Sequence, residues 1–278
     1  MGRRRPVVYD RGMHTTPTQP IGELLRMWRQ RRRLSQLDLA ADAGISPRHL
    51  SFLETGRSTP SREMVLRLAE QLDLPLRERN RLLVAAGYAP LFPERPLDTP
   101  ELGAARRAVE MVLAGHEPAP ALAIDRHWTL VAANRAVPPL LAEVEPGLLQ
   151  PPVNVIRLSL HPAGLAAKIA NYAAWRAHLI ARLRRQIELS ADPALAELLQ
   201  EVSALPFPAG ATPHAPVSGG WVAVPLQLRT RAGTLSLIST TTVFGTPVDV
   251  TLSELAIESF FPADAATAAA LRELVGQR

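Results

Sequence analysis

Residues 35–57 read SQLDLAADAGISPRHLSFLETGR, and this stretch decides how the first part of the chain folds. Ser35 is followed three residues later by an acid, so it is suited to cap a short helix that ends at Gly44. Ser46 is suited to cap the next helix, which has proline at its first position and ends at Gly56. Two short helices joined by a glycine turn predict a helix-turn-helix, although a generic helical hairpin has the same spacing.

The sequence on both sides of this motif is helical as well. The preceding helix carries apolar residues at i, i+3, i+4 and i+7, which are Ile21, Leu24, Leu25 and Trp28. A fourth helix begins near Ser61, and a fifth covers about 76–86. Residues 20–89 are therefore predicted to form an all-α domain of five helices, and the proline-rich residues 90–99 a linker.

The amino-acid sequence of residues 35–57 closely resembles that of the XRE family of lambda-repressor-like helix-turn-helix proteins, which bind specific DNA sequences. The resemblance implies that helix 46–55 enters the major groove by its N-terminal half. The residues then expected to contact bases are Ser46, Arg48, His49, Ser51 and Phe52. Those expected to contact phosphates are Gln36, Arg57 and Ser61. Arg48 can make a bidentate contact to guanine. The role of Phe52 is left open, since its ring could either contact a thymine methyl group or pack within the domain. Glu54 is expected to stabilise the fold through an intramolecular bond.

Basic charge is concentrated at the start of the chain. Residues 1–96 hold 17 Arg and 10 acidic residues, whereas residues 97–278 hold 14 basic and 16 acidic residues. Arginine displaces counterions from nucleic-acid phosphates, so this imbalance fits a DNA partner, although a solvated basic surface gives the same imbalance. Residues 1–19 lack periodicity and are predicted to be a flexible basic arm, within which Met13 offers a second start.

The composition excludes several kinds of protein. The 278 residues are 47% hydrophobic and include no cysteine, which excludes disulfides, thiol catalysis and cysteine zinc sites. No apolar run approaches the roughly 18 residues of a membrane helix, and no apolar stretch follows the arginines at 3–5 as in a secretion signal. No catalytic motif is present either, so we expect a protein that is not an enzyme and needs no cofactor or metal. Because no membrane helix or secretion signal is predicted, we expect it to be cytoplasmic and not to contact the membrane.

Residues 100–278 are predicted to form a second, α+β domain. Its helices are expected at 102–115, 164–190, 193–203 and 263–275. Its strands are expected as a pair within 121–134 and as three further strands at 221–228, 234–242 and 252–260. Two strands, then helices, then three antiparallel strands is the order of a PAS-like sensor.

Short motifs in this domain are similar in order to the MmyB-like ligand-binding domain, which commonly follows an XRE-type reader. These motifs are Asp125-Arg126-His127-Trp128, Asn134-Arg135, Asn154 with Arg157, His161-Pro162, Trp175 and Arg182. The resemblance implies a PAS-like fold around an apolar pocket for a fatty-acid-like ligand. The polar anchors expected there are Asn134, Arg157 and His161. The walls expected are Trp128, Leu160, Tyr172, Trp175, Leu226, Leu237 and Phe244.

Alternatives stay open for this second domain. Each expected pocket residue could instead be ordinary core or surface. Arg182, Arg184 and Arg185 are interpreted as a solvated face, with dimer contacts or an approach to DNA as further options. Residues 244–252 depart from the family pattern, which can mark a subgroup with a different ligand.

The two parts together predict a sequence-specific transcription regulator that binds double-stranded DNA under the control of a small apolar ligand. Because one reading helix contacts only a few base pairs, we expect a homodimer on a palindromic operator. The alternative is a constitutive dimeric repressor in which residues 100–278 serve only as a dimerisation scaffold. An enzyme fused to a DNA reader ranks third, since no catalytic constellation is present.

Overall fold

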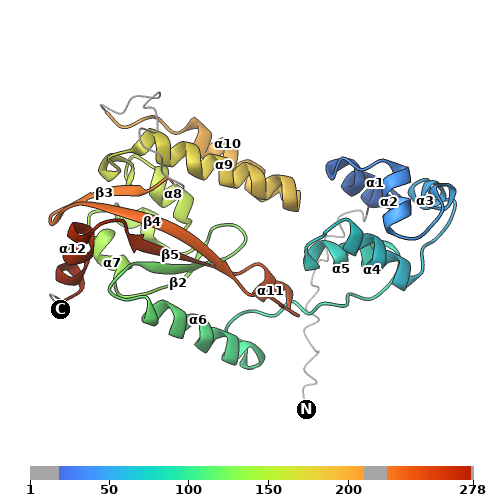
Figure 1. Ribbon diagram of the computed structural model, residues 1–278, viewed down its shortest axis with the longest axis horizontal. Coiled ribbons are helices and arrows are strands. Elements are labelled where there is room, and N and C mark those ends of the chain that lie inside the picture. The colour runs from blue at the N-terminus through green and yellow to red at the C-terminus, as the bar shows by residue number, and fades with distance from the viewer. Residues whose placement is uncertain (1–18, 210–223, 277–278) are drawn as a thin grey trace, which may run out of the picture. The chain divides into compact units, whose positions relative to one another are not determined.

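The structure of the protein is a computed structural model that describes residues 19–209 and 224–276 (Figure 1). The chain divides into two compact units, and the main division lies between Leu91 and Phe92. Within the described ranges, no helix combines the length and the apolar character needed to cross a membrane.

The first unit is all-α, as predicted. Its helices are α1 (Ile21–Arg31), α2 (Gln36–Asp42), α3 (Pro47–Glu54), α4 (Arg62–Gln71) and α5 (Leu76–Ala85). Serine side chains cap three of them, because the Oγ atoms of Ser35, Ser46 and Ser61 each accept a hydrogen bond from the backbone N–H three residues later. Gly44 ends the turn after α2 with a φ of 64°, a conformation that glycine adopts without steric cost.

The core of the first unit is built from the faces that the helices turn toward one another. Trp28 is fully buried, as are the leucines at 25, 39, 50, 53 and 68. Helix α1 approaches α3 at Gly22, where a side chain would collide with the backbone of α3. This core fixes α2 and α3 in the arrangement of a helix-turn-helix.

The second unit contains a five-stranded antiparallel sheet. Its strands are β1 (Ala121–Ile124), β2 (Leu130–Ala133), β3 (Leu226–Thr230), β4 (Gly233–Val243) and β5 (Ala256–Pro262). They lie in the order β2-β1-β5-β4-β3, so the last strand in the sequence is the central one. The predicted order of elements, two strands followed by helices and then three strands, is confirmed. The resemblance of this fold to PAS domains stays a prediction.

Helices cover both faces of this sheet (Figure 1). The longer helices are α6 (Gly103–Gly115), α9 (Tyr172–Ser190), α10 (Pro193–Ala204) and α12 (Ala265–Gly276). The shorter ones are η1 (Pro100–Leu102), α7 (Val137–Leu140), η2 (Pro146–Leu149), α8 (Val155–Leu160), η3 (Ala166–Lys168) and α11 (Val250–Ser253). Side chains alternate along the strands, so Leu122 and Phe260 pack against the cluster that includes α9. Ala123 and Ile257 pack on the opposite side, against α6.

Three predicted elements differ from the structure. The helix predicted over 164–190 begins only at Tyr172, because the preceding segment pairs with β3 and Ala170 donates its N–H to the carbonyl of Gln227. The strand predicted over 252–260 begins at Ala256, because Asp249 caps the short helix α11 before it. The strand predicted over 221–228 begins at Leu226, and residues 221–223 lie outside the described part. Helix α8 was not predicted.

Candidate DNA interface and ligand pocket

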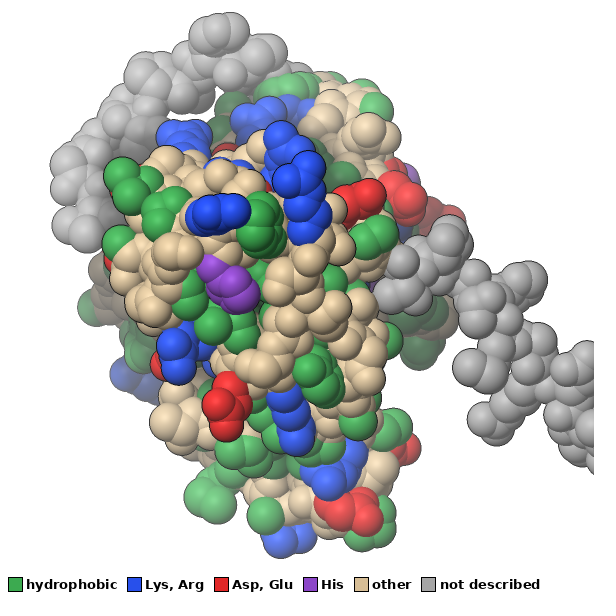
Figure 2. All heavy atoms as spheres, turned by 90° about the vertical axis from the view of Figure 1, so that its right-hand side faces the viewer, with side chains coloured by type: hydrophobic (Ala, Val, Ile, Leu, Met, Phe, Trp, Pro, Cys, Tyr) green, Lys and Arg blue, Asp and Glu red, His purple; other side chains and the backbone are tan. Residues whose placement is uncertain are grey.

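The N-terminal half of α3 presents polar side chains to solvent. Ser46 and Arg48 are exposed, and His49 and Ser51 are half-buried. Leu50 and Leu53, on the opposite side of the helix, are fully buried and hold α3 in the core. Figure 2 shows this side of the molecule, where arginine side chains lie among polar and apolar ones. The helix predicted to read DNA is therefore accessible along the expected residues.

Phe52 lies between two arginine side chains. The guanidinium carbon of Arg48 is 5.4 Å from the centre of the Phe52 ring, and that of Arg57 is 5.9 Å from it. Both distances fall in the range of a cation–π interaction, and the Phe52 side chain is half-buried. Phe52 thus contacts both Arg48 and Arg57, the residues expected to contact a base and a phosphate, and its own role, packing or a thymine contact, stays a prediction.

A buried ion pair links α1 to the end of α3. The guanidinium of Arg29 donates to both carboxylate oxygens of Glu54, at 2.6 and 2.9 Å, and the amide of Gln36 donates to Glu54 at 2.8 Å. Burial alone would raise the pKa of Glu54, but the hydrogen bonds from Arg29 and Gln36 outweigh it and hold that pKa below its usual range. The prediction that Glu54 anchors the fold is confirmed.

The same network fixes Gln36 at the start of α2. One of its two amide N–H groups is used by Glu54, and the second N–H and the carbonyl oxygen can still make hydrogen bonds. Ser61 caps α4 through its Oγ atom and is exposed, as is Arg57. The phosphate contacts expected of Gln36, Arg57 and Ser61 remain predictions.

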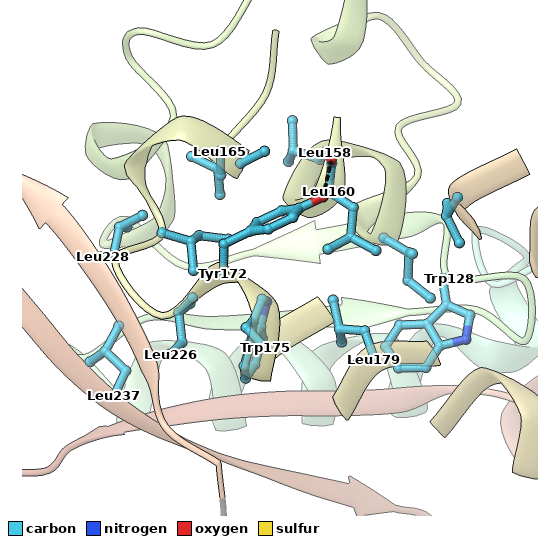
Figure 3. Close-up of a cluster of buried hydrophobic side chains, with 14 of the residues drawn as sticks. Trp128, Leu158, Leu160, Leu165, Tyr172, Trp175, Leu179, Leu226, Leu228 and Leu237 are labelled. Atoms are coloured by element: carbon cyan, nitrogen blue, oxygen red, sulfur yellow. Dashed lines mark hydrogen bonds between the residues drawn. The ribbon is translucent and has the colours of Figure 1, made fainter. Parts of the chain in front are cut away.

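The second unit contains a partly open apolar pocket between the sheet and the helices α7, α8 and α9. Its volume is about 100 Å³. Four of the predicted wall residues line it: Trp128, Trp175, Leu226 and Leu237. Figure 3 shows the buried cluster of which they are part, with Leu226 and Leu237 extending from the strands and Trp175 and Leu179 from α9.

One ion pair interrupts the apolar wall of the pocket. Arg182 on α9 donates to both carboxylate oxygens of Glu258 on β5, at 2.6 and 3.1 Å. Thr241 on β4 donates to the same carboxylate at 2.7 Å and accepts from Arg182 at 2.9 Å. The Glu258 side chain is only 4% exposed and that of Arg182 is 26% exposed. The pocket therefore holds a desolvated carboxylate whose charge is already matched.

Trp128 forms part of the pocket wall with an unusual backbone conformation. Its φ of 65° is rare for a bulky residue. Three contacts hold the side chain in place: its indole N–H donates to Gln186 at 2.7 Å, Arg182 lies over its ring at 4.7 Å, and apolar neighbours bury it. Strained residues that the surrounding structure holds firmly are concentrated at functional sites.

The three predicted polar anchors do not line this pocket. The buried side chain of Asn134 bonds four backbone groups, those of Ala121, Ala136, Leu113 and Ala119. Arg157 is exposed and paired with Glu201 at 2.7 Å. His161 accepts the N–H of Ala163 through Nδ1. All three side chains are used within the fold.

The remaining wall residues lie elsewhere in the unit. Tyr172 and Leu160 are buried in the same cluster and bonded to each other, since the Tyr172 hydroxyl donates to the Leu160 carbonyl (Figure 3). Neither of them is among the residues that line the pocket. Phe244 packs on the opposite face of the sheet, near α6.

The interpretation of Arg182 as part of a solvated face is wrong, because Arg182 lines the pocket and bonds Glu258. Arg184 and Arg185 are exposed. Helical spacing carried the missing signal, since Arg182 follows the buried Trp175 by seven positions and therefore lies on the same face of α9. Glu258 gave a similar signal, because it lies two positions before Phe260 and therefore on the same face of its strand.

Comparisons with known proteins agree with this division. Residues 105–274 match the family described as MmyB-like transcription regulator ligand binding domain, and residues 25–79 match the helix-turn-helix family. A helix-turn-helix-type transcriptional regulator of Bacillus subtilis is 38% identical over 76 residues, which cover 27% of this chain and 52% of the relative. A helix-turn-helix-type transcriptional regulator of Mycobacterium tuberculosis is 40% identical over 68 residues, which cover 24% of this chain and 27% of the relative.

The chain thus spans about half or less of the length of these relatives. A solved structure of an RNA-binding light-oxygen-voltage receptor aligns with 99% of this chain and 68% of its own, with 12% identity and a TM-score of 0.24. That score is too low to support an argument about the fold. The match to the ligand-binding domain, in contrast, extends over more than half of the chain. The chain belongs to the family of MmyB-like transcription regulators.

Proposed function

We propose that this protein binds double-stranded DNA through α3 and that a small apolar ligand in the pocket of the second unit controls this binding. The observation that carries the proposal is the apolar pocket, which lies within a domain matched to a ligand-binding family and in the same chain as an exposed reading helix. A scaffold that only held a dimer together would not need such a pocket.

The DNA part of the proposal rests on α3 and its surroundings. Arg48 and Ser51 lie on the accessible side of the helix, and Arg57 lies just beyond its end. Arginine can bond the O6 and N7 atoms of guanine together, and a serine hydroxyl can bond the edge of any base. Because α3 alone would cover few base pairs, we propose a homodimer that reads a palindromic operator.

The size of the pocket bears on the ligand. An engineered apolar cavity of about 150 Å³ binds benzene, so a pocket of about 100 Å³ accommodates a few carbon atoms without rearrangement. A fatty-acid-like ligand fits the apolar walls through its hydrocarbon part. A longer chain requires wall side chains such as Leu179 to move.

Ligand control requires that the ligand bind the DNA-bound and DNA-free forms with different affinity. Typical coupling between two sites amounts to about 5–150-fold in affinity. Such coupling would appear as a shift of operator affinity in either direction.

The experiment starts by selecting the operator from random duplexes with the purified full chain. Operator affinity is then measured by fluorescence anisotropy at fixed salt, with and without a panel of linear alcohols, esters and acids. Tryptophan emission and thermal melting report binding to the second unit, because a ligand that binds only the folded state raises the melting temperature.

Two variants on α9 sharpen the experiment. Leu179→Phe narrows the pocket, whereas Leu189→Phe adds the same bulk at an exposed position of the same helix. We expect only the first to lose the ligand response. A panel that changes neither melting nor operator affinity would overturn ligand control, and the dimeric scaffold would then be the better account.

A further inference from the structure

We propose that the pocket selects an apolar ligand whose polar group is an uncharged hydrogen-bond donor, which Glu258 receives, and that it rejects carboxylates. This inference rests on the proposed function of the pocket as a ligand site. The inference concerns the polar head group of the ligand, whereas the apolar walls determine which hydrocarbon part fits.

The positive charge in the pocket wall is already neutralised. Arg182 and Glu258 are the charged residues among those that line the pocket in the described part of the chain. Two N–H groups of Arg182 bond the two oxygens of Glu258, in the bidentate geometry that makes such pairs strong. A ligand carboxylate would therefore meet a pair with no net charge.

Glu258 is held firmly in this pair and cannot easily be displaced by a ligand carboxylate. Glu258 is on the central strand β5, paired with Leu122 of β1 and Thr241 of β4, and its side chain is 4% exposed. A carboxylate that took its place on Arg182 would leave Glu258 buried without its cation. An uncompensated buried charge is strongly unfavourable, so the pocket rejects anions.

A neutral donor meets no such obstacle. A carboxylate offers about four lone-pair sites for hydrogen bonds. Glu258 uses three of them, since Oε1 accepts from Arg182 and Thr241 and Oε2 accepts from Arg182. A ligand hydroxyl can therefore donate to Oε2 while the ion pair stays intact.

The other arginine expected to recognise an acid is engaged elsewhere. Both Nε and Nη2 of Arg157 bond Glu201, at 2.7 Å each, and Arg157 is absent from the pocket wall. No second cation among the described lining residues is thus available to a carboxylate. This arrangement separates the head group proposed here from that of a fatty acid.

The test uses the full chain and three probes built on the same six-carbon chain: hexanol, methyl hexanoate and hexanoate. Hexanol is a neutral donor, the ester is neutral without a donor, and hexanoate is an anion at neutral pH. Calorimetry and tryptophan emission give the dissociation constants. We expect hexanol to bind most tightly and hexanoate at least about tenfold more weakly, because hexanoate would bury an unmatched charge.

A substitution at the ion pair provides the reverse test. Glu258→Gln removes the negative charge, retains the shape of the side chain and leaves Arg182 free to pair with an anion. We expect hexanoate to gain affinity and to bind this variant more tightly than hexanol does. Glu201→Gln, which affects the exposed pair with Arg157, is the matched control and should leave the preference of the wild type unchanged.

The outcomes separate the two proposals. Hexanoate binding to the wild type as tightly as hexanol would overturn the inference about the head group while supporting the pocket as a ligand site. Failure of all three probes and of the shorter linear alcohols in the panel to bind would contradict both. The wild-type series decides the matter even if Glu258→Gln does not fold.

Discussion

A methyl group on Gly22 would lie 2.5 Å from the carbonyl oxygen of Leu53, so α1 and α3 meet backbone to backbone at this point. The nearest atoms belong to the main chain of α3 and cannot rotate away. The position of the reading helix therefore depends on the absence of a side chain at residue 22.

Gly22→Ala should destabilise the first unit by about 2 kcal/mol, because overpacking a close contact forces the backbone to shift. Hydrogen exchange of amides in α1 and α3 measures the loss within this unit. Gln30→Ala, at an exposed position of α1, is the control and should change the exchange rates little. Equal protection in both variants would show that α1 can move away from α3 without cost.

The ion pair between Arg29 and Glu54 should make the first unit sensitive to acid. The pKa of Glu54 is lowered in the folded state, so its stabilising contribution is complete above the ordinary carboxyl pKa and is lost as the pH falls through the folded value. Urea unfolding as a function of pH, followed by amide exchange in α3, measures this contribution.

Glu54→Gln should remove that pH dependence and reduce stability by about 3 kcal/mol or more, since it leaves Arg29 buried without its partner. Glu70→Gln, on the exposed side of α4, is the matched control. Retention of the wild-type pH profile by Glu54→Gln would assign the acid sensitivity to another group.

Arg48→Ala should weaken operator binding by about 1–3 kcal/mol and relax the preference at one position of each half-site. Arg57→Ala should weaken binding to all sequences by a similar factor, because phosphate contacts carry no base preference. Anisotropy titrations with the operator, with single-base variants and with random duplex distinguish the two effects. An equal loss of operator and random affinity in Arg48→Ala would contradict base reading.

Asn134→Ala should destabilise the second unit without changing the ligand preference of the molecules that remain folded. It removes the side-chain partner of four backbone groups, and a buried group left with no hydrogen bond costs about 1–3 kcal/mol. Arg135→Ala breaks an ion pair whose arginine is 83% exposed, so solvent screens it and its loss should change the melting temperature little. Thermal melting compares the two variants, and a stable Asn134→Ala with weakened ligand binding would restore its role as an anchor.

Local signals explain why the first unit could be predicted closely from the sequence. Ser46 caps α3 and Gly44 ends the preceding turn, and both act within a few residues of their own position. Glu54 could be assigned to the fold because it follows the buried Leu50 and Leu53 on the same helix.

The pocket depends on contacts that no local pattern contains. Arg182 and Glu258 are 76 positions apart and meet only because α9 packs against β5. Asn134 was expected to be a ligand anchor because a family resemblance indicates which residue recurs without showing what its side chain bonds. Its partners, the backbone groups near Leu113 and Ala121, become visible only when α6 and β1 are in place.

The central position of β5 has a consequence for the order in which the protein forms. Strand β1 ends at Ile124, yet its partner β5 begins at Ala256, so the sheet cannot close until almost the whole chain has been synthesised. The helices of the first unit are complete by Ala85. We expect a nascent chain to fold its reading helix long before it has a pocket, so that products terminated before Ala256 retain contact with DNA and lose the response to ligand.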